Sequence, residues 1–580
     1  MGIPGYFSHI VRKYRNVIKP IEELHKTVDN LYLDCNGFIY NAYNDIITKT
    51  TKNNSFTNDN MQHMSSNAPH RHDCSTDKGR RIFETMLIRN ACSNIGSIIL
   101  KLRPTGKIMI AFDGVAPLAK MSQQRNRRYM TAYNDIIKNK HPNRGKNIDW
   151  DTNSITPGTV FMRNLGTAVK DYFGKNKDEF NFTQHDIIVS GSDVPGEGEH
   201  KIFEYIRDNK EYHAGTCTVI YGVDADLIML SLNHLHISSN IFLYRETPEF
   251  IKSIDDTLSP DNTYIIDILA LSTDIIREIS PDTKSTDDVE TAENIQSNNN
   301  LVSDYIFMCF LLGNDFLPHF PSLNIRTHGI IRLIGTYKLL FGLPDSKYYK
   351  RSLTYNDEII WDNAFVFMKK LAEKEHDYIL DEYTTRSKES INAYRPRGYK
   401  NKIADYDPTL LMPLKDRQRE LSIDPYNPGW ETRYYCELFT DNGILYGNEQ
   451  RDICINYIQG LEWTMKYYYS GCIDWNWTYH YCFPPLMSDI VLNFPSINGI
   501  VLIKQDKAPV KPIVQLSYVL PPGSLYLIHP EAVNILLYNH PEWYTYDYKF
   551  YWAFCKFFWE SHVVLPYINI KQLSKLLDTF

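Results

Sequence analysis

Short apolar runs alternate with amphipathic stretches through the first 345 residues of the chain. Each run is almost continuously apolar, as is typical of strands buried on both faces of a parallel sheet. The runs lie at residues 30–34 (NLYLD), 107–113 (KIMIAFD), 186–190 (DIIVS) and 217–222 (CTVIYG). Helical spacing of apolar positions predicts helices over residues 81–102, 116–138, 160–173, 197–208 and 302–312. The alternation predicts an α/β fold with a central, mostly parallel sheet flanked by helices.

The pattern changes after about residue 345, so we expect two regions, residues 1–345 and 346–580. In the second region, residues 356–382 are expected to be helical. Residues 385–430 are rich in proline and charge and are expected to be irregular, and the remainder is dense in aromatic residues. Two polar segments, residues 48–79 and 280–300, contain few large apolar residues and are expected to be mobile insertions.

Composition and charge exclude several classes of protein. Hydrophobic residues make up 43% of the 580 positions, and the formal net charge is −7, so a nucleic-acid site would need a local basic patch. Ten scattered cysteines without a CxxC pair argue against a zinc knuckle and a disulfide framework. The chain shows no signal-peptide core and no apolar run of about 18 residues, so we expect a soluble intracellular protein without membrane contact.

Acidic residues follow each of the four predicted strands and the helix at residues 302–312. They are Asp34, Asp113, Glu197, Glu199, Asp224, Asp226 and Asp315. Ligands in open α/β sheets bind at the carboxyl ends of the strands, so these side chains are expected to meet there. Buried like charges are costly unless something compensates them. Two Mg²⁺ ions, about 4 Å apart, would do so and would clamp the attacking and leaving oxygens of an in-line phosphoryl displacement.

Two of these acids, Glu197 and Glu199, lie between glycines in the sequence PGEGEHK. Gly196 and Gly198 allow the backbone to turn tightly, and Pro195 suits the entry to a helix. Each acid taken singly is compatible with a cap or a turn residue. Their recurrence at one predicted sheet edge favours a metal centre instead.

A basic stripe follows Asp113 directly. Its residues lie at positions i, i+4, i+7 and i+8 of the predicted helix and therefore share one face: Lys120, Gln124, Arg127 and Arg128. Three cations and an amide beside an acidic metal site suit a terminal phosphate, because Arg and Lys supply charge and donors. The alternative is a solvated basic helix face.

Several long motifs in the chain resemble those of one family. PGEGEHKIFEYIR, YGVDADLIMLSL, LLGNDFLPHFPSL, DGVAPLAKMSQQRNRRY and the opening MGIPGYFSHIVRKY are similar to the signatures of Xrn-type 5′→3′ exoribonucleases. The resemblance continues downstream, for example through residues 457–489 and 515–524, and covers nearly the whole chain. It implies a nuclease core like that of the flap and PIN-like nucleases.

The resemblance implies a processive 5′→3′ exoribonuclease that hydrolyses single-stranded, decapped RNA carrying a 5′-monophosphate to mononucleotides. Its cofactor would be two Mg²⁺ ions, with Mn²⁺ as a substitute. Residues 1–345 would be the Xrn nuclease domain, and residues 346–580 would be the second conserved region that completes the wall of the active site. The motif around Glu197 is more similar to the cytoplasmic branch, which implies RNA decay in the cytoplasm by a monomer acting after a decapping enzyme. The chain is expected to be a minimal catalytic core.

The family's functional positions fall on residues already singled out. Its metal-binding, catalytic acids match the same seven carboxylates, and its 5′-phosphate pocket matches the basic stripe. Tyr40 takes the place of the family's base-stacking histidine, and either Trp475 or Trp477 would cover the opposite face of the terminal base. Leu438 stands where the family has a lysine. Tyrosine retains a π-face for stacking but has no imidazolium charge.

Two other functions use the same residues. A structure-specific 5′ nuclease acting on DNA flaps would need the same acids. It would normally carry a Gly-rich helix–hairpin–helix after Asp315, where this chain has the proline-containing apolar segment 316–325 (FLPHFPSLNI). A non-catalytic RNA-binding scaffold would keep the fold without needing every acid.

Overall fold

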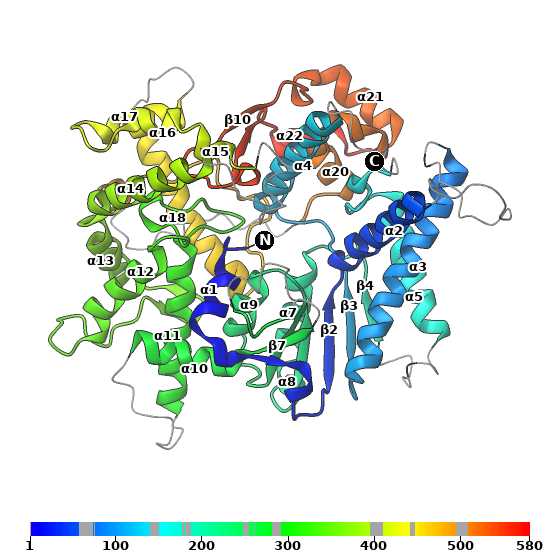
Figure 1. Ribbon diagram of the computed structural model, residues 1–580, viewed down its shortest axis with the longest axis horizontal. Coiled ribbons are helices and arrows are strands. Elements are labelled where there is room, and N and C mark those ends of the chain that lie inside the picture. Colours follow the sequence, from blue (N-terminus) through cyan, green and yellow to red (C-terminus); the bar gives the residue numbers. More distant parts are fainter. Residues whose placement is uncertain are drawn as a thin grey trace.

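A computed structural model describes most of the chain. The described residues are 2–56, 74, 76–139, 150–176, 180, 187–246, 255–259, 262–280, 292–394, 410–440, 447–494 and 508–580. They form a central sheet with helices on both faces and a second, mostly helical region beside it (Figure 1).

The central sheet has seven strands in the order β1-β7-β6-β5-β2-β3-β4. The neighbours from β6 through β4 pair in parallel, whereas β7 runs antiparallel to both β6 and β1. The strand bounds are β1 Ile18–Pro20, β2 Asn30–Asp34, β3 Ile108–Ala111, β4 Ile187–Ser190, β5 Thr218–Tyr221, β6 Ile241–Glu246 and β7 Thr263–Asp267. The structure therefore confirms the predicted α/β fold with a mostly parallel sheet.

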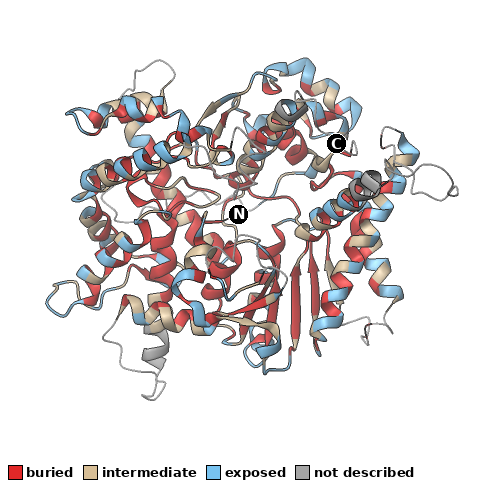
Figure 2. Cartoon of the chain, in the orientation of Figure 1, coloured by how far each residue is buried: buried red, intermediate tan, exposed pale blue. Residues whose placement is uncertain are grey.

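Alternate residues of each strand pack into two separate cores, one on each face of the sheet. In β2, Leu31 and Leu33 lie in the core under helices α2, α3 and α5, whereas Tyr32 lies in the core under α1, α7, α9, α10 and α11. Figure 2 shows the strands buried between these two layers. The helix bounds are α1 Tyr6–Lys13, α2 Asn36–Phe56, α3 Asp77–Leu102, α5 Val160–Lys175, α7 Gly198–Asp208, α9 Asp226–Asn233, α10 Ile268–Ile279 and α11 Ala292–Phe310.

The four predicted strands correspond to β2, β3, β4 and β5, with ends that differ by no more than two residues. The five predicted helices correspond to α3, α4, α5, α7 and α11, and α4 spans Leu118–Asn139. Strands β1, β6 and β7 were not predicted. Strand β6 pairs in parallel with β5 and antiparallel with β7, and β1 joins β7 from the other end of this region in sequence, as in the pair Ile18 and Ile266.

The second region wraps α4 and one end of the sheet. In Figure 1, α4 lies above the sheet beside α20 and α22, and it packs against α20. Helix α12 (Gly329–Tyr337) lies just before this region. The main helices of the region are α13 Trp361–Ala372, α14 Glu375–Tyr394, α16 Gln418–Ile423, α17 Trp430–Phe439, α18 Gly447–Tyr469, α19 Met487–Leu492, α20 Pro512–Val519, α21 Pro530–Asn539 and α22 Ile570–Leu576. A hairpin of β10 (Lys549–Tyr551) and β11 (His562–Val564) completes this region.

Three expected loop segments are partly helical. Helix α2 runs on to Phe56 and α3 begins at Asp77, so both ends of the segment 48–79 belong to helices. Helix α11 begins at Ala292, inside the segment 280–300. Helix α14 extends to Tyr394, so the first part of 385–430 is not irregular. The central parts of these segments lie outside the described residues.

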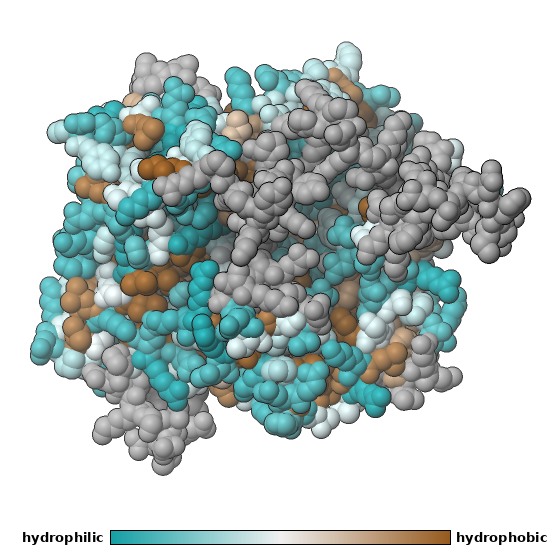
Figure 3. Space-filling model, in the orientation of Figure 1, coloured by the Kyte–Doolittle hydropathy of each residue, from teal (hydrophilic) through white to brown (hydrophobic). Residues whose placement is uncertain are grey.

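Polar side chains cover most of the described surface on the face shown in Figure 3, and apolar ones gather in small separate patches. Every helix in the described ranges is either too short or too polar to cross a bilayer.

Candidate active site

The seven predicted acids converge at the carboxyl edge of the parallel strands. Asp34 is the last residue of β2, and Asp113 follows β3 by two residues. Carboxylate oxygens of Asp34, Asp113 and Glu199 lie within 4.8 Å of one another. Glu197 belongs to a second such group with Glu199. Glu199 therefore links the two groups.

The remaining three acids are electrostatically coupled to this group. Asp226 begins α9 after β5, and Asp315 follows α11. The charge of Asp224 contributes to the raised pKa of Asp34, and the charge of Asp315 contributes to the raised pKa of Asp226. The strand ends and the starts of α7 and α9 thus bring all seven acids into one centre.

Gly198 is the point at which helix α7 approaches the strands. Its backbone N–H donates to Oδ1 of Asp113 at 2.7 Å. A Cβ at this position would lie 2.6 Å from Oδ1 of Asp34. Glu197 stands at the N-cap position of α7 and Glu199 lies in its first turn, where the helix dipole favours negative charge. The glycine is therefore what allows the two glutamates to reach the aspartates.

A second glycine approaches the centre from the beginning of the chain. A Cβ on Gly2 would lie 1.8 Å from Oδ1 of Asp226. The segment before α1 therefore packs directly on the acidic centre, although Gly2 and Asp226 lie far apart in sequence.

The acids are mutually destabilising in their charged forms. Burial, and then the charges of Asp113 and Asp224, raise the pKa of Asp34 well above its ordinary value. Burial, and then the charge of Glu197, raise the pKa of Glu199 in the same way. Burial and Asp315 raise the pKa of Asp226 to about 7.

Divalent cations fit this centre. Oδ1 of Asp34 and Oδ1 of Asp226 are buried without a hydrogen-bond partner among the residues that the structure describes. Hard cations such as Mg²⁺ prefer carboxylate oxygens, and a nearby cation removes the repulsion that raises these pKa values. The donor set of seven carboxylates therefore suits divalent metal ions.

Lys120 lies among the acids. Its Nζ pairs with Oδ2 of Asp315 at 2.8 Å and also with Oε2 of Glu197. Burial opposes the charge of this lysine, but Asp315 and Glu197 outweigh burial and hold the pKa of Lys120 well above its ordinary value. Lys120 therefore balances part of the negative charge of the centre itself.

The rest of the basic stripe runs away from the centre along α4. Gln124 is half-buried and Arg127 is exposed. Arg128 donates to Oδ1 of Asn153 at 2.7 Å. Eight residues separate Lys120 from Arg128, which is about 12 Å along a helix. The stripe thus begins inside the acidic centre and reaches solvent at Arg127.

The three candidate stacking aromatics differ in their surroundings. Tyr40 is 43% exposed and lies close enough to Arg128 to influence the pKa of that guanidinium. Trp475 is half-buried, and its carbonyl accepts the backbone N–H of Leu118 at the start of α4. Trp477 is buried and stacks on Trp463 with ring centroids 5.1 Å apart. Leu438, at the position of the family's lysine, lies in the separate core that also holds Tyr434 and Tyr435.

Several residues of the centre were missed from the sequence. Tyr467 in α18 donates to Oε1 of Glu197 at 2.8 Å, and His200 stacks on its ring at 3.7 Å. Burial, and then the charge of Asp226, raise the pKa of Tyr468 well above its ordinary value. His200 also offers a nitrogen within 4.8 Å of oxygens of Glu197 and Glu199. The sequence gives no signal for the two tyrosines beyond aromatic density, because Glu197 is 270 residues away from Tyr467.

The fold and the site define an α/β protein with a buried carboxylate centre suited to divalent cations. The chain belongs to the Xrn family. A family model described as XRN 5′-3′ exonuclease N-terminus matches residues 1–247, and one described as Xrn1 helical domain matches residues 296–416 and 414–580.

Curated relatives extend over the whole chain. It is 26% identical to the 5′-3′ exoribonuclease 2 of Debaryomyces hansenii, covering 100% of this chain and 70% of that protein. It is 29% identical to the human 5′-3′ exoribonuclease 1, covering 100% of this chain but only 34% of that protein. For the 5′-3′ exoribonuclease 1 of Saccharomyces cerevisiae the identity is 26%, and the chain spans 43% of its length.

Proposed function

We propose that this protein is a 5′→3′ exoribonuclease that hydrolyses single-stranded RNA with a 5′-monophosphate to mononucleotides. The observation that carries the proposal is the meeting of seven carboxylates with a basic stripe that starts among them on α4. The names of the curated relatives support the same activity.

The seven carboxylates would hold two divalent ions, Mg²⁺ by preference and Mn²⁺ as a substitute. When bound, such ions supply Lewis acidity to a scissile phosphodiester and favour ionisation of a water molecule. Lys120 orients Glu197 and Asp315 and reduces the repulsion between them. Tyr467 holds Glu197 from the opposite side through its hydroxyl group. The packing of α18 on the centre keeps bulk water out.

The basic stripe would bind the terminal phosphate. Gln124, Arg127 and Arg128 offer an amide and two guanidinium groups along one face of α4, which is a suitable donor set for a phosphate dianion. A phosphate held there would place the first phosphodiester linkage of the RNA toward the carboxylates. Cleavage would then release one nucleotide from the 5′ end, and repeated advance of the strand would make the enzyme processive.

Tyr40 and Trp475 would stack on the terminal base. Both side chains are at least partly exposed, and Tyr40 lies near Arg128 at the phosphate end of the stripe. Trp477 is occupied by its stacking on Trp463, which favours Trp475 as the partner of Tyr40. Aromatic stacking tolerates every base, as an exonuclease requires.

The wider setting follows from the same chemistry. Residues 1–345 would carry the nuclease centre, and residues 346–580 would complete its wall through Tyr467 and Tyr468. A 5′-monophosphate arises when a decapping enzyme removes the cap, so such an enzyme would act upstream in RNA decay. The motif around Glu197 is more similar to that of the cytoplasmic branch of the Xrn family, so we propose a cytoplasmic location. We also propose that the protein acts as a monomer.

A substrate panel tests the proposal. The protein is incubated with 5′-monophosphate, 5′-hydroxyl and capped RNA and with flap DNA, each with Mg²⁺, with Mn²⁺ and with EDTA. We expect metal-dependent release of nucleoside 5′-monophosphates from the first RNA and little from the others. Preferential cutting of the DNA flap would favour the structure-specific nuclease, and binding without cleavage would favour the scaffold.

A further inference from the structure

The segment before α5 packs against the far end of the basic stripe. Its first described residue, Trp150, lies in the core under α2, α3 and α5. The ring of Trp150 is 5.6 Å from that of Phe83 and 5.2 Å from that of Phe161, measured between ring centroids. The segment is therefore fixed to the core shortly before Asn153, the residue that accepts a hydrogen bond from Arg128.

Local hydrogen bonds hold the backbone of Asn153. Oδ1 of Asp151 accepts the backbone N–H of Asn153 at 2.8 Å, at the start of a short 3-10 helix, Thr152–Ser154. The hydroxyl group of Thr156 donates to the carbonyl oxygen of Asn153 at 2.6 Å. Both backbone groups of Asn153 are thus bound, so its side chain projects from a fixed point.

The side-chain amide of Asn153 joins the basic stripe to the second region. Its Oδ1 accepts from Nη1 of Arg128 at 2.7 Å, and its Nδ2 donates to Oγ of Ser524 at 2.9 Å. Ser524 is buried in the 3-10 helix Pro522–Leu527. A guanidinium group can only donate, so the amide oxygen must face Arg128 and the amide nitrogen then faces Ser524. The second region therefore helps to orient this amide.

The guanidinium group of Arg128 is held by neutral oxygens. Besides Oδ1 of Asn153, the carbonyl oxygen of Ile155 accepts from Nη2 of Arg128 at 3.5 Å. Neither acceptor carries a negative charge, so these contacts position the guanidinium group without neutralising it. A guanidinium group has five N–H donors, and the two used here leave others for a ligand. This arrangement suits a cation that must be in place before an anionic ligand arrives.

We propose that Asn153 is a positioning residue for recognition of the 5′-phosphate, an inference that rests on the proposed function. Asn153 holds the guanidinium group of Arg128 where the terminal phosphate binds, and it leaves the positive charge of that group available. Ser524 acts one contact further away by orienting the amide. Through these contacts, residues 346–580 take part in selecting RNA with a 5′-monophosphate. Positioning the arginine in advance reduces the entropy cost of ordering it on binding.

The test measures kcat/KM with Mg²⁺ for 5′-monophosphate RNA and for 5′-hydroxyl RNA, and takes the ratio of the two. A loss of folded protein lowers both values equally, so the ratio reports on recognition of the phosphate. Asn153→Ala should lower the ratio by about 10-fold, as expected for losing a hydrogen bond to a charged group. Ser524→Ala should lower it by about 2- to 10-fold, the range for a hydrogen bond between neutral groups.

The conservative variant Asn153→Asp separates positioning from a merely structural role. Its carboxylate has nearly the shape of the amide and still accepts from Arg128, so a merely structural role predicts a wild-type ratio. Our inference predicts a ratio lowered by about 10-fold or more, because an ion pair with Asp neutralises the charge that the phosphate needs.

A double-mutant cycle tests whether Asn153 acts through Arg128. Arg128→Ala alone should lower the ratio, and adding Asn153→Ala should lower it no further. An additive loss would mean that Asn153 contacts the RNA by itself, and it would overturn the positioning role.

Asn176 supplies a matched control. It is half-buried like Asn153, and its Nδ2 donates to the carbonyl oxygen of Tyr172 at 2.9 Å. It follows the last residue of α5, a helix of 16 residues, so it lies about 24 Å from the start of that helix. Asn176→Ala and Asn176→Asp should both keep the wild-type ratio.

The outcomes separate this inference from the proposed function. An unchanged ratio in Asn153→Ala or in Asn153→Asp overturns the positioning role, while cleavage of 5′-monophosphate RNA by wild-type protein leaves the proposed function standing. Failure of wild-type protein with Mg²⁺ to cleave that RNA, or equal kcat/KM values for the two RNAs, overturns the proposed function and the positioning role with it.

Discussion

A methyl group on Gly198 would lie 2.6 Å from Oδ1 of Asp34 and 3.3 Å from the carbonyl oxygen of Ala111. Gly198→Ala should therefore displace Asp34, although alanine itself favours the helix. A displacement of about 1 Å in a catalytic group can reduce turnover by about 100-fold. We expect a loss of that order in Mg²⁺-dependent nucleotide release, measured with 5′-monophosphate RNA.

Gly174 supplies the matched control for this substitution. It lies near the end of α5, and a Cβ added there meets no atom within 4 Å among the described residues. Gly174→Ala should keep wild-type turnover. Equal activity of the two variants would contradict the close approach of α7 to Asp34.

Arg127 is the exposed cation of the basic stripe. Arg127→Ala should lower the preference for 5′-monophosphate over 5′-hydroxyl RNA by about 10- to 100-fold, because a hydrogen bond to a charged group contributes about 1.5–3 kcal/mol. The ratio of kcat/KM values for the two RNAs measures this preference. Arg163→Ala removes an exposed arginine from α5 as a control. An unchanged ratio in Arg127→Ala would contradict the proposal that the basic stripe binds the terminal phosphate.

The sequence predicted that these acids meet at one edge of the sheet, but it did not predict which residues surround them. The acids follow strand ends, and strand ends meet at one edge for topological reasons. The position of Lys120 among the acids depends on how closely α4 approaches α11, which no local pattern records. The burial of Trp477 against Trp463 likewise depends on the packing of α18 against the segment that follows it.

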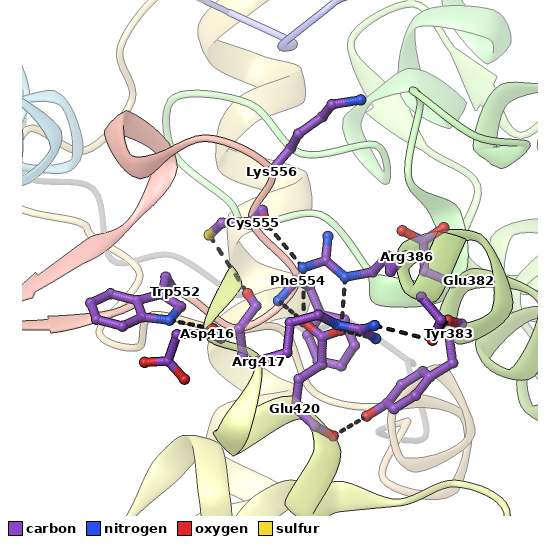
Figure 4. A network of polar contacts seen from close by, with 12 residues as sticks. Glu382, Tyr383, Arg386, Asp416, Arg417, Glu420, Trp552, Phe554, Cys555 and Lys556 are labelled. Atoms are coloured by element: carbon purple, nitrogen blue, oxygen red, sulfur yellow. Dashed lines mark hydrogen bonds and ion pairs between the residues drawn. The ribbon is translucent and has the colours of Figure 1, made fainter. Parts of the chain in front are cut away.

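At the scale of elements, a buried ion network joins α14, α16 and the segment before β11. Glu420 accepts two hydrogen bonds from Arg386, each of 2.8 Å, and a third from Nε of Arg417 (Figure 4). Arg386 also donates to the carbonyl oxygen of Cys555. The backbone N–H of Phe554 donates to Glu420. The network thus holds the segment before β11 against α14 and α16.

Glu420→Gln should strongly destabilise the protein. Removing one partner from a buried pair leaves an uncompensated charge on Arg386, which costs about 3–5 kcal/mol. Urea denaturation followed by tryptophan fluorescence measures the loss. Glu373→Gln breaks an exposed pair with Lys370 and should cost less than about 1 kcal/mol. Similar losses in both variants would contradict the importance of the network.

The same network predicts a pH dependence of stability. Burial opposes the charge of Glu420, but Arg386 outweighs burial and lowers the pKa of this carboxyl below its ordinary value of 4.5. The folded state therefore binds this proton less readily than the unfolded state does. The stabilisation is complete above about pH 4.5 and is lost as the pH falls through the folded-state pKa. Denaturation curves from pH 7 to pH 3 should show this loss in wild-type protein and a smaller one in Glu420→Gln.

The four predicted strands and the helices α3, α4, α5 and α7 lie within four residues of their predicted ends, whereas α11 begins ten residues earlier than predicted. The antiparallel strands β1 and β7 escaped prediction because β1 is short and half-buried. Its pairing with β7 joins residues about 250 positions apart. The extension of α14 to Tyr394 was not predicted because the sequence there is polar. Tyr383 and Arg386, which anchor this helix, bond to Glu420, which lies 37 and 34 residues further along the chain.

At the scale of the whole molecule, one hydrophobic core crosses the boundary between residues 1–345 and 346–580. Phe310 packs against Tyr468, Phe316 against Trp463 and Phe320 against Tyr457, with ring centroids 5.3, 4.9 and 5.0 Å apart. These residues belong to one core cluster with the sheet. The two regions therefore stabilise each other.

A fragment of residues 1–345 should not fold by itself. It would expose the rings that α18 covers, and exposed apolar surface of this kind leads to association. We expect the fragment to bind a hydrophobic dye and to lack a cooperative thermal transition, as measured by calorimetry. A cooperative transition in the isolated fragment would contradict the shared core.

The central claim is that the carboxylate centre hydrolyses RNA from the 5′ end with bound divalent ions. Its most direct test is mononucleotide release from uniformly labelled 5′-monophosphate RNA by wild-type protein and by Glu199→Gln, with Mg²⁺ or EDTA. The account predicts release of nucleoside 5′-monophosphates by wild-type protein with Mg²⁺ alone, while Glu199→Gln still binds the RNA. Undiminished release in EDTA or by Glu199→Gln would contradict it.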